Sequence, residues 1–354
     1  MKIIRLTTLL DFGGQERQLI SFTDHSKNLK NEYIFAAIGH GGKAEEIIKN
    51  RGFKVYCFNT NPSIYNLKNI WTLYKWFKKE EPELVHTAAA EANFHGIIAA
   101  KLAGVKYIVG EEIGIPNHSK QARFIFKQIY KRAQNVVCVS KAVKQNLIEL
   151  GEINHNQGTV IYNPVSQPKK YDRIKNQNFT ILTVGRLAPV KNLDILIKAI
   201  SMTEDQKIRL IIVGDGPERN NLENLAKSEQ IENRVNFIGF SNEPEKYLAQ
   251  ADLFVLPSFS EGFGIAAVES MFCEVPCLCT NVGGIPELIK ENKTGWLFNP
   301  YGLDELVEKI NTITKLETKD LEKVGRNGRQ YAFKNFTSKK YIETLERFYT
   351  SLQQ

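Results

Sequence analysis

The sequence predicts an α/β protein that contains two doubly wound parallel sheets, one in each half of the chain. Short β-branched runs alternate with longer helical patterns, which is typical of repeated βαβ units. The length of 354 residues suits two domains of about 150–200 residues. A polar, turn-rich stretch from Ile161 to Asn178 interrupts both patterns and is interpreted as the linker. Because ligands bind at the carboxyl ends of such strands, we expect the two domains to face each other across a cleft.

The first domain is predicted over residues 1–164. It opens with the strand "KIIRLTTL", which leads through Gly13 and Gly14 into a helix over "QERQLISFTDHS". Further strands, separated by helical segments, are predicted at "YIFAAIG", "KVYCFN", "LVHT", "YIVGE" and "NVVCVS". This alternation is that of a parallel sheet with helices on its faces.

The second domain is predicted over residues 165–337, where the alternation starts again. Its strands are expected at "FTILTVG", "IRLIIVG", "VNFIGF", "DLFVLPS", "CLCTN" and "GWLFN", and its helices include "NLDILIKAI", "ERNNLENLAKSE" and "LDELVEKINTI". Residues 338–354, "SKKYIETLERFYTSLQQ", form an amphipathic helix well beyond the last strand.

The charge of the chain is unevenly distributed. Residues 1–175 contain 26 Lys and Arg against 15 Asp and Glu, whereas the remaining residues contain 21 against 24. A basic first half suggests contact with an anionic surface, either lipid headgroups or nucleic acid. The alternative is a solvated basic face that favours solubility. No nucleic-acid-binding signature is present, which argues against the second kind of partner.

The cysteines and the chain start indicate a cytoplasmic protein. Five cysteines and no export signal point to a reducing compartment. Cys277 and Cys279 lie in a short apolar run without a zinc-like ligand spacing, so they are expected to be buried free thiols. The first twelve residues lack the features of a signal peptide, and no uncharged apolar run approaches 18 residues.

Several common site motifs are absent. The stretch "GDGPER" supplies Gly214 and Gly216 but has Arg219 where a dinucleotide fingerprint needs its third glycine. The phosphate loop, H-E-x-x-H and G-x-S-x-G are also missing. No D-x-D is present to hold a divalent metal against a diphosphate, so we expect no metal and no cofactor. Any bound diphosphate must then be balanced by side chains and helix dipoles.

The stretch "VGRLAPVKNLDIL" supplies suitable cations. A strand ends at Val184, a loop with Gly185 and Arg186 follows, and Lys191 is predicted to begin the next helix. Both cations would project from the carboxyl end of the sheet, where an Arg fork and a Lys point charge suit phosphate oxygens. The alternative is a pair of ordinary surface cations.

The stretch "SEGFGIAAVE" strengthens this interpretation. It follows the strand "DLFVLPS", so its glycines fall where a strand passes into a helix, and the free N–H groups there attract anions. Glu261 in the turn can reach sugar hydroxyls, and Glu269 can accept from paired ribose hydroxyls. The alternative is a glutamate that complements the helix dipole together with a solvated one in mid-helix.

The motifs together resemble a known family. The segments "GGQERQL", "GRLAPVKNLD", "VGDGPER", "SEGFGIAAVE" and "NVGGIPELI" occur in the order found in retaining nucleotide-sugar glycosyltransferases of family 4, which have the GT-B fold of two Rossmann-like domains. The resemblance covers almost the whole chain, and E-x7-E with the Arg/Lys loop is its most specific part. It implies an acceptor-binding first domain, completed by the terminal helix 338–354, and a donor-binding second domain.

The resemblance also implies roles for individual residues. Arg186 and Lys191 would bind the donor diphosphate and stabilise the departing nucleotide, Glu261 would lie near the transferred sugar, and Glu269 would hold the ribose. The glycine-rich turns and loops would contact the donor or approach the reaction centre: Gly13, Gly14, Gly185, Gly214, Gly216, Phe263 and Gly264.

One departure from the family concerns the first domain. The family usually has a histidine after the strand that matches "YIVGEEIG", but this chain has Glu111 and Glu112 there. A carboxylate is therefore one candidate for the missing contact. Alternative polar groups on the acceptor or sugar side are His86, interpreted as ending the strand "LVHT", and Asn93 or His95 shortly afterwards, although a lone histidine is as often structural.

The implied reaction moves a hexosyl or N-acetylhexosaminyl group from a nucleoside diphosphate, commonly UDP, to a saccharide with retained configuration. The preferred acceptor is a lipid-linked oligosaccharide of bacterial surface polysaccharide synthesis. Two basic segments rich in aromatic residues, "NIWTLYKWFKKEEP" and "SKQARFIFKQIYKRAQN", suggest peripheral contact with the inner face of the cytoplasmic membrane. The alternatives are a sugar-nucleotide epimerase, a phosphorylase, or a non-catalytic sugar-nucleotide-binding protein of the same fold.

Overall fold

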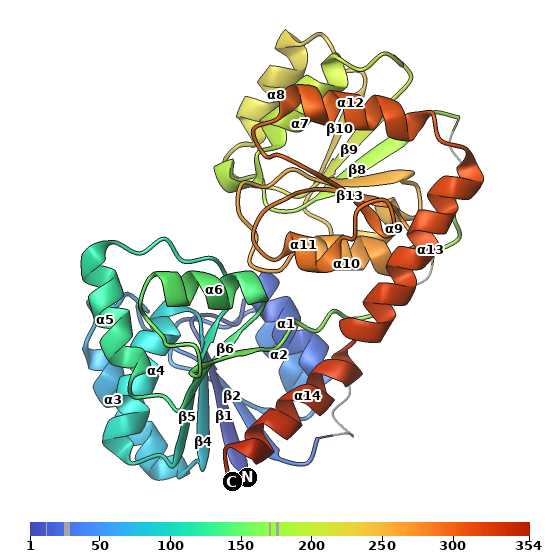
Figure 1. Cartoon of the computed structure of the whole chain (residues 1–354). Helices are drawn as coiled ribbons and strands as arrows, with labels where there is room; N and C mark the ends of the chain where they lie inside the picture. The colour runs from blue at the N-terminus through green and yellow to red at the C-terminus, as the bar shows by residue number, and fades with distance from the viewer. Residues whose placement is uncertain (12, 25–28, 170, 175–176) are drawn as a thin grey trace. The chain divides into compact units, whose positions relative to one another are not determined.

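The structure is a computed structural model that describes residues 1–11, 13–24, 29–169, 171–174 and 177–354. The chain divides into two compact units (Figure 1). Unit 1 comprises Met1–Ser166 and Phe336–Gln354, and unit 2 comprises Gln167–Asn335. Both boundaries differ by two residues from those expected at 164/165 and 337/338. Three residues of the expected linker (170, 175 and 176) and the end of the first expected helix, from residue 25, lie outside the described part.

Unit 1 contains a sheet of seven parallel strands in the order β3-β2-β1-β4-β5-β6-β7. The strands are β1 Lys2–Thr7, β2 Glu32–Ala37, β3 Lys54–Cys57, β4 Leu84–Ala88, β5 Tyr107–Glu112, β6 Asn135–Cys138 and β7 Gly158–Val160. The helices are α1 Gly14–Thr23, α2 Lys43–Asn50, α3 Lys68–Glu80, α4 Ala90–Ala103, α5 Lys120–Tyr130, α6 Lys141–Glu149 and α14 Ser338–Ser351.

Helices cover both faces of the unit 1 sheet. In Figure 1, α1, α2 and α14 lie on one side, and α3, α4 and α5 lie on the other. The central strands are buried on both faces, as expected for a parallel sheet covered on two sides, and they bury the polar side chains of Arg5, His86 and Glu111 as well as apolar ones. The terminal helix α14 contributes Tyr341, Leu345 and Tyr349 to the same core cluster as Ile3 and Phe35. Unit 1 is therefore made from both ends of the chain, as the resemblance implied.

Unit 2 contains six parallel strands in the order β10-β9-β8-β11-β12-β13. The strands are β8 Thr180–Val184, β9 Arg209–Val213, β10 Val235–Gly239, β11 Leu253–Leu256, β12 Cys277–Thr280 and β13 Gly295–Phe298. The helices are α7 Leu193–Ser201, α8 Arg219–Ser228, α9 Glu245–Leu248, α10 Ile265–Phe272, α11 Ile285–Leu288, α12 Leu303–Thr314 and α13 Thr318–Asn335, and Pro189–Lys191 form a 3-10 turn.

Both sheets reverse their strand order at one point, between β1 and β4 in unit 1 and between β8 and β11 in unit 2. Open α/β sheets bind ligands outside the carboxyl ends of the strands at such a point. The expected free thiols Cys277 and Cys279 are confirmed, because both are buried and unbridged on β12. Within the described ranges, no helix is both long and apolar enough to cross a membrane.

Candidate active site

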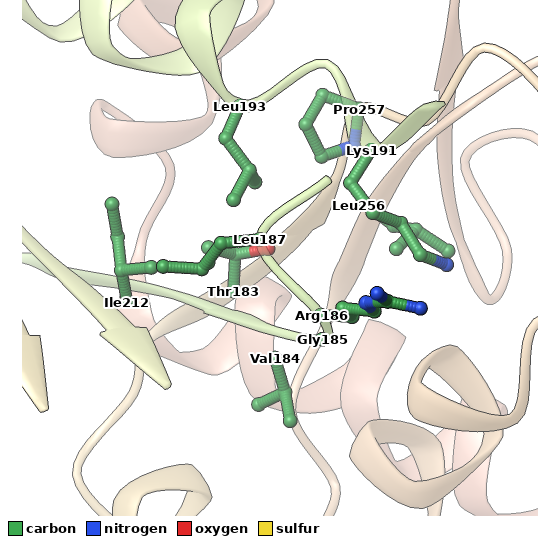
Figure 2. Close-up of a pocket in the computed structure, with 10 residues that line it drawn as sticks. All are labelled: Thr183, Val184, Gly185, Arg186, Leu187, Lys191, Leu193, Ile212, Leu256 and Pro257. Carbon is green, nitrogen blue, oxygen red and sulfur yellow. The ribbon is translucent and has the colours of Figure 1, made fainter. Parts of the chain in front are cut away.

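The candidate site of unit 2 lies where β8 and β11 meet. Arg186 and Lys191 follow β8, and Glu261 follows β11. The loop after β8 and the end of β11 border a small hollow (Figure 2). It is lined by Thr183, Val184, Gly185, Arg186, Leu187, Lys191, Leu193, Ile212, Leu256 and Pro257. The structure thus gathers the two cations and the following carboxylate at the switch point of one sheet.

Lys191 and Glu261 form an ion pair in this site. Lys191 Nζ lies 2.6 Å from Glu261 Oε1, and the Ser258 hydroxyl donates to the same oxygen at 2.7 Å. The two side chains are 26% and 12% exposed, so the pair is partly shielded from water yet open to a ligand. Sequence reasoning missed Ser258, although it stands in the "LPS" that ends the preceding strand. Charge-assisted contacts of this kind are roughly twice as strong as neutral ones.

Asn192 fixes the backbone beside Lys191. It adopts a left-handed conformation, with φ 52° and ψ 39°, between the 3-10 turn and α7. Its buried amide donates to the carbonyl oxygens of Pro257 at 3.1 Å and Pro300 at 2.8 Å. The prediction that Lys191 begins a helix was wrong, because Lys191 ends the 3-10 turn and α7 starts only at Leu193. The loops after β8, β11 and β13 are joined through this one side chain.

Arg186 differs from Lys191 in its surroundings. Its side chain is exposed, and within the described part of the chain its guanidinium has neither a hydrogen bond nor an ion pair. Figure 2 shows that the Arg186 and Lys191 side chains extend to the same side of the loop, whereas Leu187 and Ile212 lie on the other side of it. Arg186 therefore offers a full set of donors to an incoming anion.

Gly214 and Gly216 allow close backbone packing beneath Arg186. A Cβ atom at Gly214 would lie 1.8 Å from Gly185 O, and one at Gly216 would lie 2.3 Å from Leu187 O. The amide of Gly185 donates to Val213 O at 3.0 Å. These glycines, expected on the donor side, thus have a packing role that their sequence motif did not reveal.

The turn before α10 holds the Glu261 backbone firmly. Gly264, with φ +101°, caps the helix, and Phe263 is buried. The amide of Gly284 donates to Glu261 O at 3.0 Å, and a Cβ atom at Gly283 would lie 1.9 Å from that oxygen. Glu269 is the fifth residue of α10 and is half-buried. The prediction that the glycines mark the strand-to-helix passage is confirmed.

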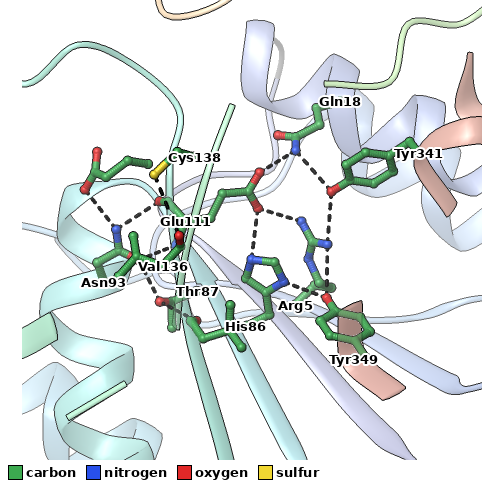
Figure 3. A network of polar contacts seen from close by, with 12 residues as sticks. Arg5, Gln18, His86, Thr87, Asn93, Glu111, Val136, Cys138, Tyr341 and Tyr349 are labelled. Carbon is green, nitrogen blue, oxygen red and sulfur yellow. Dashed lines mark hydrogen bonds and ion pairs between the residues drawn. The ribbon is translucent and has the colours of Figure 1, made fainter. Parts of the chain in front are cut away.

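A buried polar network occupies the face of the unit 1 sheet beneath α14 (Figure 3). Arg5 Nη2 lies 2.9 Å from Glu111 Oε2, and Gln18 donates to Glu111 Oε1 at 2.6 Å. His86 Nδ1 lies 2.6 Å from the hydroxyl of Tyr349, which also accepts from Arg5 at 3.4 Å. Tyr341 completes the network, because its hydroxyl accepts from Arg5 and from Gln18 at 3.3 Å.

This network sets the charge of its members. Burial raises the pKa of Glu111, but the Arg5 guanidinium, together with His86 and Gln18, outweighs it and holds the pKa at about 2. Burial and the same guanidinium lower the pKa of His86 to about 4, so the imidazole is neutral at pH 7. The prediction that His86 ends its strand was wrong, since β4 continues to Ala88 and His86 is fully buried in mid-strand.

Asn93 and Glu112 lie on a second, smaller network at the end of β5. Asn93 accepts from the Thr87 hydroxyl at 2.6 Å and donates to Glu112 Oε1 at 3.1 Å. The Tyr130 hydroxyl donates to the same Glu112 oxygen. No hydrogen bond to Glu112 Oε2 is present among the residues that the structure describes. Burial raises the pKa of Glu112 to about 7, although Tyr130, His118 and Asn93 act in the opposite direction.

Gly13 and Gly14 lie where expected, at the first turn of α1. Gly13 is the N-terminal cap of α1, and a Cβ atom there would lie 2.6 Å from Glu16 Oε2. Glu16 is itself buried, which raises its pKa. Over the described residues, no group of three or more His, Cys, Asp or Glu side chains is arranged to hold a metal ion.

The sequence matches two families that together span most of the chain. Residues 12–167 match the family described as Glycosyltransferase Family 4, and residues 167–331 match Glycosyl transferases group 1. The junction of the two matches at residue 167 coincides with the boundary between unit 1 and unit 2.

Individual relatives agree with this. An uncharacterized glycosyltransferase, MJ1178, of Methanocaldococcus jannaschii is 30% identical over 246 residues, which cover 69% of this chain and 67% of the relative. The UDP-Gal:alpha-D-GlcNAc-diphosphoundecaprenol alpha-1,3-galactosyltransferase of Escherichia coli is 27% identical over 313 residues, covering 82% and 80%. The structure of Alr3699/HepE from Anabaena in complex with UDP-glucose shares the fold, with a TM-score of 0.87, 23% identity and coverage of 99% and 100%. The chain therefore belongs to the family 4 glycosyltransferases, with the two Rossmann-like units of the GT-B fold.

Proposed function

We propose that this glycosyltransferase moves a hexosyl or N-acetylhexosaminyl group from a UDP-linked donor to a saccharide acceptor and retains the anomeric configuration. The observation that carries the proposal is the common direction of Arg186 and Lys191 at the switch point of unit 2, beside the Glu261 carboxylate. A diphosphate needs several cationic donors in a fixed arrangement, and these side chains supply them. In this proposal they balance the diphosphate charge without a metal ion.

The two members of the ion pair would bind different parts of the donor, its diphosphate and its sugar. Lys191 would donate to a phosphate oxygen, while Glu261 would accept from a hydroxyl of the transferred sugar. As the bond between the anomeric carbon and the diphosphate oxygen breaks, the electron pair stays on the diphosphate, where Arg186 and Lys191 stabilise it. The diphosphate then takes the proton of the acceptor hydroxyl, whose oxygen bonds to the anomeric carbon on the same face.

The names of the relatives support the substrate class. The Escherichia coli relative is named for a UDP-sugar donor and a diphosphoundecaprenol-linked acceptor, and the Anabaena structure contains UDP-glucose. We therefore propose a lipid-linked oligosaccharide of bacterial surface polysaccharide synthesis as the acceptor, used at the cytoplasmic face of the membrane.

Among the candidate residues of unit 1, we propose that Glu112 is the one that contacts a sugar. His86 and Glu111 form hydrogen bonds within the network under α14. The side-chain oxygen of Asn93 accepts a hydrogen bond and its nitrogen donates one. Glu112 differs because, among the described residues, the hydrogen bonds to its carboxylate all go to Oε1, from Tyr130 and Asn93. Its Oε2 is the oxygen that would accept from a sugar hydroxyl.

The exposed aromatic residues of α3 and α5 support membrane contact. Phe126 and Ile129 are core residues, but Phe124 is 66% exposed and Trp71 is 57% exposed. Lys75 lies over the Trp71 ring at 5.5 Å. Helix α5 carries Lys120, Arg123 and Lys127 and no acidic residue. Apolar side chains surrounded by cations bind anionic bilayers.

Flotation with vesicles of phosphatidylglycerol and phosphatidylethanolamine tests the membrane contact. We expect the protein to float at physiological salt, and the double variant Trp71→Ser/Phe124→Ser to remain in the dense fractions. Tyr301→Ser is the matched control, because Tyr301 is 79% exposed but lies in unit 2. Failure of the unaltered protein to float would rule out this part of the proposal.

A thermal-shift screen with nucleotide sugars tests the main proposal, because a ligand that binds the native state raises its melting temperature by mass action. One UDP-sugar should stabilise the protein, and Lys191→Ala should remove that shift. Lys198→Ala is the control, since the Lys198 side chain is 43% exposed and, within the part of the chain that the structure describes, its ion pair is with Asp194 on the same helix. Conversion of the donor without an acceptor would instead indicate an epimerase, and binding without turnover would indicate a binding protein.

A further inference from the structure

An exposed aromatic pair lies beside the candidate active site and has no role in the proposal above. Phe259 and Tyr301 are 38% and 79% exposed, with their ring centroids 5.1 Å apart and their planes tilted by 32°. Val190, which is 45% exposed, is joined to Phe259 by the backbone hydrogen bond from Phe259 N to Val190 O at 2.9 Å. We call these three residues the aromatic platform.

The platform is built into the loops that form the site. Val190 directly precedes Lys191, and Phe259 lies two residues before Glu261. The amide of Asn192 joins the loops on either side, because it donates to Pro257 O and to Pro300 O, next to Tyr301. Three loops at the carboxyl edge of one sheet, joined by Asn192, thus carry the platform and the Lys191–Glu261 pair.

The chemistry of the platform selects among possible occupants. Three side chains are far fewer than the 20 to 30 residues per side of a typical protein interface. An anionic membrane is disfavoured too, because residues 167–335, which make up unit 2, hold 22 Lys and Arg against 23 Asp and Glu and so carry no excess of positive charge. Flat aromatic faces beside the exposed phenol of Tyr301 suit a ring with one apolar C–H face and hydroxyls at its edge. A sugar ring has that character, and a glycosyltransferase must bind sugars.

We propose that the aromatic platform is a saccharide subsite, in which a pyranose ring of the acceptor stacks on Phe259 and Tyr301. The Tyr301 hydroxyl then reaches a hydroxyl of that sugar. This inference rests on the proposed function, because it takes the acceptor to be a saccharide; it does not depend on which nucleotide sugar is the donor.

Saturation-transfer NMR tests the subsite. The probes are the methyl glycosides of galactose and of N-acetylglucosamine, measured with saturating UDP. We expect transfer to the ring C–H protons of at least one probe in the unaltered protein, and its loss in Phe259→Leu/Tyr301→Ser. Phe259→Tyr keeps the flat face and should retain the transfer, whereas Tyr65→Ser, at a residue 88% exposed in unit 1, should have no effect.

The affinity for UDP, measured by thermal shift on the same proteins, separates a sugar from a nucleobase. We expect it to remain unchanged in the double variant, while the KM for a saccharide acceptor rises by about tenfold or more. A parallel loss of UDP affinity would assign the platform to the base instead and overturn the inference. Equal transfer in the double variant and the unaltered protein, or none in either, would also overturn it.

Discussion

Lys191 Nζ and Glu261 Oε1 lie 2.6 Å apart at the switch point of unit 2, so the candidate cation and the candidate sugar-binding carboxylate hold each other in place. Loops that follow different strands bring them together, with 69 residues between them in the chain. The ion pair therefore orients both side chains at the site where a donor would bind.

Replacement of Lys191 by alanine should lower turnover by about two orders of magnitude or more, because a preorganised charge partner of the departing diphosphate is lost. The fold should persist, since the side chain is 26% exposed. Steady-state kinetics with the donor found in the screen provide the measurement. Lys198→Ala should turn over normally, and near-normal turnover of Lys191→Ala would contradict the assignment.

Replacement of Asn192 should destabilise unit 2. Asn192→Ala removes two buried hydrogen bonds and replaces asparagine, which tolerates the left-handed conformation, by alanine, which tolerates it less well; together these changes should lower the free energy of unfolding by about 3 kcal/mol. Asn192→Gly loses the same bonds without the backbone cost and should be more stable than the alanine variant by about 1 kcal/mol. Urea denaturation measures both, and equal stabilities would show that the left-handed backbone carries no strain.

Replacement of Glu112 by glutamine should change the pH profile of kcat/KM. Only the ionised carboxylate accepts strongly from a sugar hydroxyl, and the pKa of about 7 means that this form is lost as the pH falls through neutrality. The unaltered enzyme should therefore lose activity below about pH 7, while Glu112→Gln should be slower but level across this range. The Tyr130 hydroxyl donates a hydrogen bond that lowers the pKa of Glu112. Tyr130→Phe removes this bond, so the loss of activity on acidification should begin at a higher pH in that variant.

Glu149→Gln is the control for the loss of one carboxylate, because Glu149 is exposed on α6. Its pH profile should match that of the unaltered enzyme. If Glu112→Gln keeps the acidic limb, the titrating group lies elsewhere and the assignment of Glu112 is wrong.

The stability of the protein should also depend on pH through His86 and Glu112, in opposite directions. The pKa of His86 falls from 6.5 to about 4 on folding, so the unfolded chain binds more protons and stability drops as the pH falls from 6.5 towards 4. The pKa of Glu112 rises from 4.5 to about 7, so the folded chain binds more protons and stability grows as the pH falls from 7 towards 4.5.

Single variants should separate these two effects. Glu112→Gln should lose stability on acidification from pH 6.5 to 4.5, by up to about 3 kcal/mol, because the His86 contribution is no longer offset. His86→Gln should gain stability over the same interval. Melting temperatures measured across this range test both signs, and parallel curves for the two variants would refute the opposing linkage.

The parts of the site predictable from sequence are those that depend on local patterns. The glycines around Phe263 mark the strand-to-helix passage, and the cations after β8 follow from the end of its apolar run. The positions that sequence did not reveal depend on distant partners. Asn192 gives no local sign that its amide joins two other loops, and Arg5 reads as a break in an apolar strand although it pairs with Glu111.

The fold was predictable for the same reason, with exceptions that include the short edge strand β7 and helix α13. Helix α13, Thr318–Asn335, was not expected because it is polar and contains Gly325 and Gly328. The structure explains Gly325, since a Cβ atom there would lie 2.0 Å from Glu274 O. The glycine permits close packing of this helix against the end of α10, which is a tertiary requirement that no local pattern displays.

The network beneath α14 separates the order of synthesis from the order of folding. Arg5 lies in the first strand, but its phenol partners Tyr341 and Tyr349 are 336 and 344 residues further along the chain. A ribosome must therefore finish all of unit 2 before the unit that it started first can bury its own guanidinium. Domains usually fold in the order in which they emerge, whereas here the unit that emerges first is completed last.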